Sequence, residues 1–276
     1  QTRAILAAWG MPAQAIETTL PHLLYADLHG IDSHGVAMLR KYSDNLAARR
    51  LVIDPVIRIV AESKSTALID GGGGLGHVPA AMAMELAIAK CRATGAAVVT
   101  VGNSGHFGAA GSYTSMAGAA GLIGIATTNA PPAVVPSGGV EAKLGTNPIA
   151  FAAPAARNKP FHLDMATSAA PVGRLMTAWR KGRSIPAGWA VDEKGRELTN
   201  PRRAALLRLL TPLGSYRDLA NHKGYGLGAM VEILSSLLPR IQPGESRQTA
   251  HPHIGHFFLA IDPDRFRPPG SFQQDV

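Results

Sequence analysis

The stretch Ala26-Asp27-Leu28-His29-Gly30-Ile31-Asp32-Ser33-His34-Gly35 joins two segments that have helical periodicity. One apolar pattern ends within this stretch, and a second begins just after Ser33. We therefore expect Ser33 at a helix N-cap and His34 in the first helical turn, close to the carboxylates of Asp27 and Asp32. An imidazole beside acids at a helix start is suited to proton transfer. The alternative is that Asp32 and Ser33 only cap a helix, and that His34 is a surface residue.

Helical and strand-like patterns alternate along the rest of the chain. Apolar periodicity predicts helices over 13–29, 34–49, 78–94, 109–120, 170–181 and 224–238. Short apolar runs predict strands over 56–60, 66–70, 96–101, 122–128, 148–153, 160–164 and 256–262. Pro21 falls inside the first helix and predicts a kink or two shorter helices there. The alternation favours a layered α/β fold, with a mixed β-sheet covered by helices and a helical N-terminal part.

The composition narrows the class of protein. The 276-residue chain is 46% hydrophobic and 17% charged, which is typical of a globular enzyme. Its single cysteine, Cys91, excludes an internal disulfide and fits a reducing compartment. The N-terminal residues show no pattern of a secretion signal, so we expect a cytoplasmic protein. No apolar run is long enough to predict a membrane span. The net charge of +8 comes from scattered cations without aromatic stacking residues, so we expect anionic small molecules as ligands and no nucleic acid.

A glycine-rich stretch, Gly71-Gly72-Gly73-Gly74-Leu75-Gly76, formally matches the dinucleotide fingerprint G-x-G-x-x-G. It follows an apolar strand and precedes a helix. A Rossmann site also needs an acid at the end of the next strand to bind the ribose, and that strand runs into Gly102 and Asn103. We therefore predict a tight glycine turn that packs strand against helix, in a fold that is not of the Rossmann type.

Five further motifs follow in order, and they are Val101-Gly102-Asn103-Ser104-Gly105-His106-Phe107-Gly108-Ala109-Ala110-Gly111, Lys143-Leu144-Gly145-Thr146-Asn147-Pro148, Leu163-Asp164-Met165-Ala166-Thr167-Ser168, His222-Lys223-Gly224-Tyr225-Gly226 and Gly255-His256-Phe257-Phe258. With the opening stretch, this set resembles the malate/L-lactate dehydrogenase family that is unrelated to the Rossmann-type enzymes. The resemblance covers about residues 2–266. It implies a homodimeric oxidoreductase that uses NAD or NADP and acts on a small 2-oxo or 2-hydroxy acid. Relatives also include sulfolactate, ureidoglycolate and diketogulonate enzymes and reductases of cyclic imino acids, and the last of these is the alternative function.

The catalytic residues follow from the chemistry and the resemblance together. Reduction of a 2-oxo acid needs a hydride on the carbonyl carbon and a proton on its oxygen. The resemblance implies that His34 is the proton donor and Ser33 its helper. A helix N-terminus disfavours the imidazolium, so Asp27 or Asp32 is expected to compensate. His106 lies in a glycine-rich loop, and in relatives the matching residue lines the active site beside the nicotinamide, some of them using it as a general base.

The substrate carboxylate needs cationic or hydroxyl partners. Lys143 and Thr146 flank a turn and are predicted to bind it, although Lys143 is also readable as a solvated surface charge. Arg40 is the other cationic candidate. Relatives usually carry arginine where this chain has Met38, which is either a core-facing helix residue or a sign of a different substrate or reduced activity.

Two segments are predicted to bind the cofactor. A carboxylate at a strand end accepts hydrogen bonds from ribose hydroxyls, and relatives place the cofactor on this segment, so the predicted residues are Phe161, His162, Leu163, Asp164, Met165 and Ala166. The alternative for Asp164 is an N-cap of the following helix. Because lysine and free amides at a helix start suit a diphosphate, we also predict that His222 and Lys223 bind the cofactor.

The sequence also predicts how the chain divides into domains. We expect a cofactor-binding α/β domain over 61–215, and a substrate and dimerisation part formed by 1–60 with 216–276. The resemblance implies a further cofactor-contacting segment beyond Val276, and with Met38 this leaves open a non-catalytic binder of an anionic metabolite. His251, His253 and His256 are spaced like metal ligands but lack a cysteine or acid at ligand spacing, so no metal site is predicted.

Overall fold

The computed structural model describes residues 1–241 and 254–276, which form two compact units. Unit 1 comprises 1–127, 150–164 and 235–276, and unit 2 comprises 128–149 and 165–234. This division differs from the predicted boundary at 61 and 215. The difference arises because strands from three separate parts of the chain join one sheet in unit 1, whereas a sequence pattern shows only local segments. The roles predicted for the two parts remain predictions.

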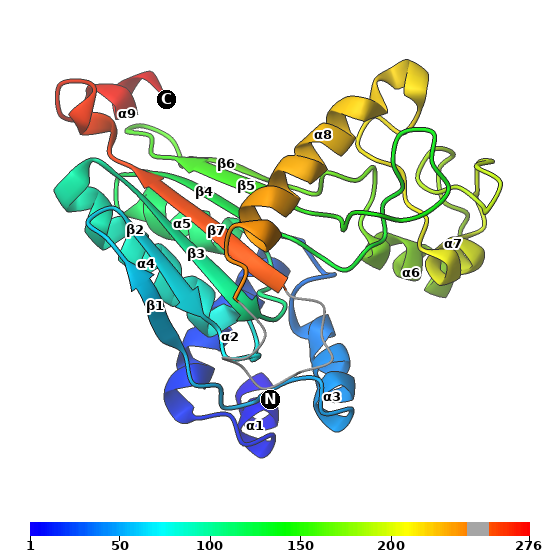
Figure 1. Cartoon of the computed structure of the whole chain (residues 1–276), viewed down its shortest axis with the longest axis horizontal. Helices are drawn as coiled ribbons and strands as arrows, with labels where there is room; N and C mark the ends of the chain where they lie inside the picture. The colour runs from blue at the N-terminus through cyan, green and yellow to red at the C-terminus, as the bar shows by residue number, and fades with distance from the viewer. Residues whose placement is uncertain (242–253) are drawn as a thin grey trace. The chain divides into compact units, whose positions relative to one another are not determined.

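A mixed sheet is the centre of unit 1 (Figure 1). In spatial order, the strands of the described residues are β1 (Arg58–Glu62), β2 (Thr66–Asp70), β3 (Ala96–Ser104), β7 (Ile254–Ile261), β4 (Ile123–Thr128), β5 (Ile149–Ala153) and β6 (Phe161–Met165). β2 runs parallel to β3, whereas β1 is antiparallel to β2 and β7 is antiparallel to β3. The predicted non-Rossmann α/β fold with a mixed sheet is therefore confirmed.

The helices of unit 1 are α1 (Thr2–Ala8), α2 (Ala13–Leu28), α3 (Leu39–Ala47), α4 (His77–Thr94), α5 (Gly111–Ala119) and α9 (Ser271–Asp275). The alanine-rich face of α4 is fully buried at Ala80, Ala83 and Ala87, and it shares one core cluster with Val99 and Phe258 of the sheet. Small side chains let this helix approach the sheet closely. The helix ends at Thr94, where the next residue is a glycine with a left-handed backbone, as the sequence predicted.

The first long helix passes through its proline. α2 runs from Ala13 to Leu28 with Pro21 inside it, so the prediction of two shorter helices is wrong. Proline removes one helical hydrogen bond, the one to the carbonyl of Glu17. Both residues are exposed, so water can satisfy that carbonyl. The short helices α1 and α9 had no sequence prediction.

Unit 2 carries helices α6 (Val172–Arg180), α7 (Pro201–Leu207) and α8 (Asn221–Glu232). Asn200 caps α7 by accepting the Arg203 amide at 3.0 Å, and Pro201 occupies the first helical position. The core of this unit is a separate cluster of apolar side chains, which includes Val134, Leu144, Leu175, Ile185, Leu198 and Leu210. Among the residues that the structure describes, no helix combines the length and the apolar character that a membrane span requires.

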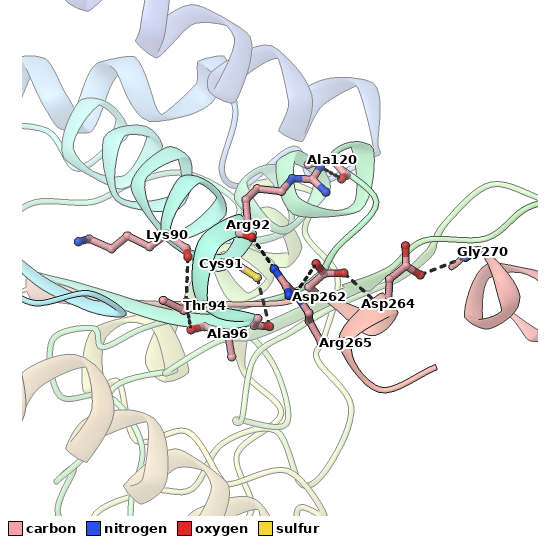
Figure 2. A network of polar contacts seen from close by, with 11 residues as sticks. Lys90, Cys91, Arg92, Thr94, Ala96, Ala120, Asp262, Asp264, Arg265 and Gly270 are labelled. Atoms are coloured by element: carbon pink, nitrogen blue, oxygen red, sulfur yellow. Dashed lines mark hydrogen bonds and ion pairs between the residues drawn. The ribbon is translucent and has the colours of Figure 1, made fainter. Parts of the chain in front are cut away.

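Polar contacts fix the end of α4 against the segment that follows β7 (Figure 2). Arg265 donates to the carbonyl of Arg92 at 3.0 Å, and its Nε lies 3.7 Å from Oδ2 of Asp262. The amide of Asp262 donates to the carbonyl of Gly95 at 2.9 Å, and Cys91 lies buried beside it with Sγ 3.5 Å from the same carbonyl. These contacts hold α4 in register with the central strands, and therefore also fix where its N-terminus lies.

At the opposite end of α4, the glycine-rich stretch contacts the loop that follows β3. The amides of Gly71, Gly73 and Gly76 donate to the carbonyls of Gly102, Asn103 and His106 at 2.9, 2.8 and 3.0 Å. These amides bind backbone, so they are not available to cradle a phosphate. The glycine-rich stretch forms a tight turn between β2 and α4, and its hydrogen-bond partners are the last residues of β3 and His106 of the loop that follows.

Substitution of Gly76 by alanine tests this close approach. The added Cβ would lie 2.4 Å from the carbonyl oxygen of Gly105 and 2.8 Å from Cβ of Phe107. We expect Gly76→Ala to lower the free energy of unfolding by about 1–3 kcal/mol, measured by urea denaturation. Gly226→Ala is the matched control, because no atom of the described chain lies within 4 Å of its Cβ position and alanine favours the helix. Equal stability of the two variants would contradict the assignment.

Candidate active site

The Ser33-His34 stretch forms a turn that precedes the helix. Helical structure starts later, as a 3₁₀ turn over Val36–Met38 that leads into α3. Oδ2 of Asp27 accepts the amide of Val36 at 2.9 Å, while Oγ of Ser33 lies 2.7 Å from Nδ1 of His34. The predicted N-cap at Ser33 is therefore wrong. Asp27 supplies the acceptor because the end of α2 brings its carboxylate against Gly35, where a Cβ would meet it.

The structure brings the two predicted catalytic histidines together. His106 lies on the loop after β3, and the centroids of its ring and that of His34 are 5.3 Å apart. Tyr42 of α3 approaches from the other side, with its hydroxyl 2.7 Å from Nδ1 of His106. The same Nδ1 accepts the amide of Gly108 at 3.2 Å. The hydroxyl of Ser33 contacts Nδ1 of His34, which agrees with the helper role predicted for Ser33. Nε2 of His34 is then the ring nitrogen that can exchange a proton.

Burial controls the charge of this pair. It lowers the pKa of His34 below 6.5, and the positive charge of Lys41 lowers it further. Burial also lowers the pKa of His106 well below 6.5, with smaller contributions from the neighbouring His34 and Lys41. Compensation by Asp27 or Asp32 was predicted, but the charge that acts on His34 is a cation. At neutral pH both rings are therefore neutral, and His34 is poised to accept a proton.

A second layer of buried histidines surrounds this pair. His256 of β7 stacks on Phe107 with ring centroids 4.4 Å apart, and its Nε2 lies 2.9 Å from Oγ of Ser104. Nδ1 of His22 lies 2.6 Å from a serine hydroxyl on α5. Neither ring nitrogen of His77 has a hydrogen-bond partner among the described residues. Sequence reasoning did not predict this layer, because its members lie on three different elements, β7, α2 and α4. Only His256 belongs to one of the sequence motifs.

The predicted carboxylate-binding residues have different surroundings. Lys143 is exposed and pairs with Glu141 at 2.6 Å, as its surface alternative predicted. The carbonyl of Thr146 accepts a hydrogen bond from the amide of Thr167, with 3.0 Å between the two atoms. Arg40 is exposed on α3, whereas Lys41, the next residue, is the cation that acts on both catalytic histidines. Binding of substrate by Arg40, Lys143 and Thr146 remains a prediction.

Met38, where the resemblance led us to expect arginine, is half-buried. Met38 packs against an apolar cluster of unit 1 that is formed by Leu6, Met11, Ile16, Leu23, Tyr42 and Leu75. Its side chain thus supports the helix that carries Lys41 and Tyr42. This packing agrees with the core-facing alternative for Met38.

The predicted cofactor strand is an edge strand. Phe161, His162, Leu163 and Asp164 of β6 are all exposed, and the next two residues, Met165 and Ala166, are half-buried. Oδ2 of Asp164 accepts the amide of Gly111 at 2.8 Å, at the N-terminus of α5. The alternative that Asp164 caps the following helix is therefore wrong, because the helix it binds comes earlier in the chain. The residue as a whole is exposed, but partial desolvation of its carboxyl against the start of α5 raises the pKa of Asp164, and the Gly111 amide opposes that effect.

The second predicted cofactor segment opens α8. Ala220 precedes the helix with a left-handed backbone (φ 60°), and no side chain of the described residues caps this end. His222 and Lys223 are exposed in its first turn. The amides of Asn221 and Lys223 already donate to the carbonyls of Tyr216 and Ala220 at 3.1 and 2.9 Å. The fit to a diphosphate therefore rests on the exposed side chains of His222 and Lys223 and on the positive end of the helix dipole. Asn147 holds the helix in place, because its Nδ2 donates to the carbonyl of Gly228 at 2.9 Å.

No cluster of three or more metal-binding side chains exists in the part of the chain that the structure describes. Of the three histidines weighed as ligands, His251 and His253 lie outside the described residues. His256 is buried and bound to Ser104.

Comparison with known proteins shows what the chain resembles. Residues 1–276 match a family described as malate/L-lactate dehydrogenase. Malate dehydrogenase of Pyrococcus horikoshii is 42% identical over 278 residues, which cover 99% of this chain and 76% of that protein. (2R)-3-Sulfolactate dehydrogenase (NADP(+)) of Chromohalobacter salexigens is 35% identical over 269 residues, which cover 95% and 78%. The crystal structure of malate dehydrogenase from Entamoeba histolytica superposes with a TM-score of 0.93 at 33% identity, covering 100% of this chain and 80% of that one.

The buried histidines predict that the protein loses stability in acid. Burial lowers the folded-state pKa of His77 and His256 to about 3 and that of His22 to about 4, from an ordinary value of 6.5. Between pH 4 and 6.5 the unfolded chain binds more protons, so the free energy of unfolding falls as the pH falls and is fully restored above pH 6.5. Each such ring contributes a slope of at most about 1.4 kcal/mol per pH unit.

We expect His77→Leu to flatten this dependence, measured by urea denaturation at a series of pH values from 4.5 to 7. The slope is the readout, because it is separate from any change in overall stability. His222→Leu is the control, since this histidine is exposed and its loss leaves the slope unchanged. An unchanged slope in His77→Leu would show that His77 is protonated in the folded protein.

Proposed function

Because the chain belongs to the malate/L-lactate dehydrogenase family, we propose that it is an NAD- or NADP-dependent oxidoreductase that acts on a small 2-hydroxy or 2-oxo acid. The observation that carries the proposal is the pair His34 and His106, two imidazoles that burial keeps neutral and that lie side by side. A neutral imidazole is the form that accepts the hydroxyl proton when a 2-hydroxy acid is oxidised.

His34 exchanges the proton in this proposal. When the alcohol is oxidised, the hydroxyl proton passes to Nε2 of His34 as the C–H hydrogen leaves with its electron pair. A bound nicotinamide accepts or supplies that hydride. In the reverse direction the His34 imidazolium gives its proton to the carbonyl oxygen. Ser33, with its hydroxyl 2.7 Å from Nδ1, fixes the orientation of the ring.

The cofactor is held by the residues whose chemistry fits it. We assign the diphosphate to the first turn of α8, where Lys223 adds a positive charge to the helix amides and His222 adds a further donor. We assign a ribose hydroxyl to the Asp164 carboxylate, and its neighbours Phe161, His162, Leu163, Met165 and Ala166 to the same cofactor. Oδ2 of Asp164 already accepts an amide, so the assignment rests on its remaining acceptor sites.

We assign the substrate carboxylate to two cationic side chains and one hydroxyl. Arg40, Lys143 and Thr146 are retained as its partners, and the action of Lys41 on both histidines supports an anionic substrate next to them.

A homodimer is also proposed. Its support is a group of exposed apolar side chains along α8 and at the residue that follows it, formed by Leu227, Met230 and Ile233. The cytoplasmic location remains a prediction from the sequence.

Absorbance of the reduced nicotinamide tests the function directly. NADH and NADPH are assayed separately with pyruvate, oxaloacetate, glyoxylate, sulfopyruvate and a cyclic imino acid. Turnover of any 2-oxo acid supports the proposal and names substrate and cofactor together, whereas turnover of the imino acid alone would favour the alternative reductase. Absence of turnover with every substrate, together with cofactor binding measured by fluorescence, would favour a non-catalytic binder.

In the active assay, we expect His34→Asn to lower kcat by about 100-fold or more while the Kd for NAD(P)H changes less than about threefold, because the variant loses only the proton exchange. His29→Asn, an exposed histidine five residues earlier, is the control and keeps full activity. Activity of His34→Asn within a few-fold of the parent would remove His34 from the mechanism.

Lys223→Met tests the cofactor site. Loss of a charged donor to the diphosphate is expected to raise the Kd for NAD(P)H by about 10- to 100-fold, measured by fluorescence titration. Lys194→Met changes another exposed lysine of unit 2 and serves as the control. An unchanged Kd in Lys223→Met would place the diphosphate elsewhere.

A further inference from the structure

Nδ1 of His106 meets two groups at hydrogen-bond distance. The amide of Gly108 lies at 3.2 Å and the hydroxyl of Tyr42 at 2.7 Å. An amide N–H can only donate a hydrogen bond, so Nδ1 has to be the acceptor. In a neutral imidazole, an unprotonated Nδ1 requires the proton to reside on Nε2.

Tyr42 is a donor in this arrangement. Its ring is buried in the apolar cluster of unit 1, with 1% of its surface exposed, and burial raises the pKa of the phenol above its ordinary value. The hydroxyl therefore keeps its proton and donates a hydrogen bond to the accepting nitrogen. The phenol comes from α3 and the amide from the loop after β3, so two independent elements impose the same tautomer.

The loop around His106 is itself tightly held. The carbonyl of His106 accepts the amide of Gly76, and Ser104 contacts His256 from β7. The ring therefore has little freedom to turn and present Nδ1 in place of Nε2.

We infer that Tyr42 is a positioning residue that fixes His106 as the Nε2–H tautomer, so that His106 acts as a hydrogen-bond donor to the substrate oxygen and not as a general base. The inference rests on the proposed function for the identity of that oxygen. His34 moves the proton, and His106 stabilises the partial negative charge on the same carbonyl or alkoxide oxygen. A neutral donor suits this task, because it polarises the oxygen without competing for its proton.

The charged and titratable groups that face His106 are His34, Lys41, His77, His256 and Tyr42. The three other imidazoles are kept neutral by burial, and Lys41 is a cation. Burial is the largest cause that disfavours an imidazolium at His106, and the positive charge of Lys41 adds to it, so the donor proton on Nε2 belongs to the neutral ring.

Long-range ¹H–¹⁵N NMR of protein labelled at histidine nitrogens measures the tautomer directly. The signals of His106 are assigned by their loss in His106→Gln. In the wild-type chain at pH 7, we expect a protonated Nε2 and an unprotonated, hydrogen-bonded Nδ1. A proton on Nδ1 would overturn the inference. This measurement requires no turnover, so it separates failure of the tautomer from failure of the proposed dehydrogenase activity.

Tyr42→Phe removes the hydroxyl and keeps the ring. We expect a measurable Nδ1–H population at His106 and a fall in kcat of about 10-fold with KM changed less than about threefold. 4-Aminophenylalanine at position 42, which restores a donor, should recover both. Tyr113→Phe is the matched control, because its buried hydroxyl donates to the Phe107 carbonyl and not to the imidazole. It should lose stability but keep the tautomer.

An unchanged tautomer and unchanged kcat in Tyr42→Phe would overturn the role of Tyr42. If Tyr42→Phe does not fold, 3-fluorotyrosine at position 42 retains the ring and strengthens the donor. It should shift the Nδ1 resonance of His106, and the absence of a shift would count against the inference.

Discussion

Three backbone hydrogen bonds join the glycine-rich stretch to the end of β3 and to the loop that follows it, and the geometry of the histidine site depends on them. They require the two backbones to approach so closely that a Cβ at Gly76 would enter the carbonyl of Gly105. With the loop fixed in this way, His106 meets both Tyr42 and the ring of His34. The stretch that formally matches a nucleotide-binding fingerprint therefore acts on catalysis indirectly, by holding a loop.

Burial then decides the chemistry of the site. Five imidazoles lie in one region of unit 1, on α2, α4, β7, the turn before α3 and the loop after β3, and desolvation is the largest cause of the lowered pKa at each. A neutral cluster destabilises the fold in acid, because the unfolded chain binds protons that the folded chain cannot accept. The same neutrality lets His34 accept a proton and lets His106 donate a hydrogen bond at neutral pH. The loss of stability in acid and the proposed activity near neutrality thus have a common cause.

Met38 stands where the resemblance led us to expect an arginine. Its side chain joins the apolar cluster that also contains Tyr42, so the position supports the helix instead of facing substrate. Positive charge next to the histidines comes from Lys41, three residues later on the same chain segment. The prediction named Arg40 as a cation for the substrate carboxylate. The two residues are neighbours in sequence, but about 100° of helix rotation separates their side chains, and periodicity alone did not decide between them.

The sequence by itself determined the elements with strong periodicity, the mixed α/β class and the family, and it predicted catalytic roles for His34 and His106. These signals are local, because helices and strands repeat over a few residues and motifs are contiguous. Tertiary structure alone decided that Asp27 and not Ser33 binds the helix start, that Asp164 binds an earlier helix, and that Tyr42 and His256 support the His106 loop. Those partners lie up to 152 residues apart in the chain. Such pairs carry no periodic signature, since only the packing of the sheet and its helices brings them within reach of a hydrogen bond.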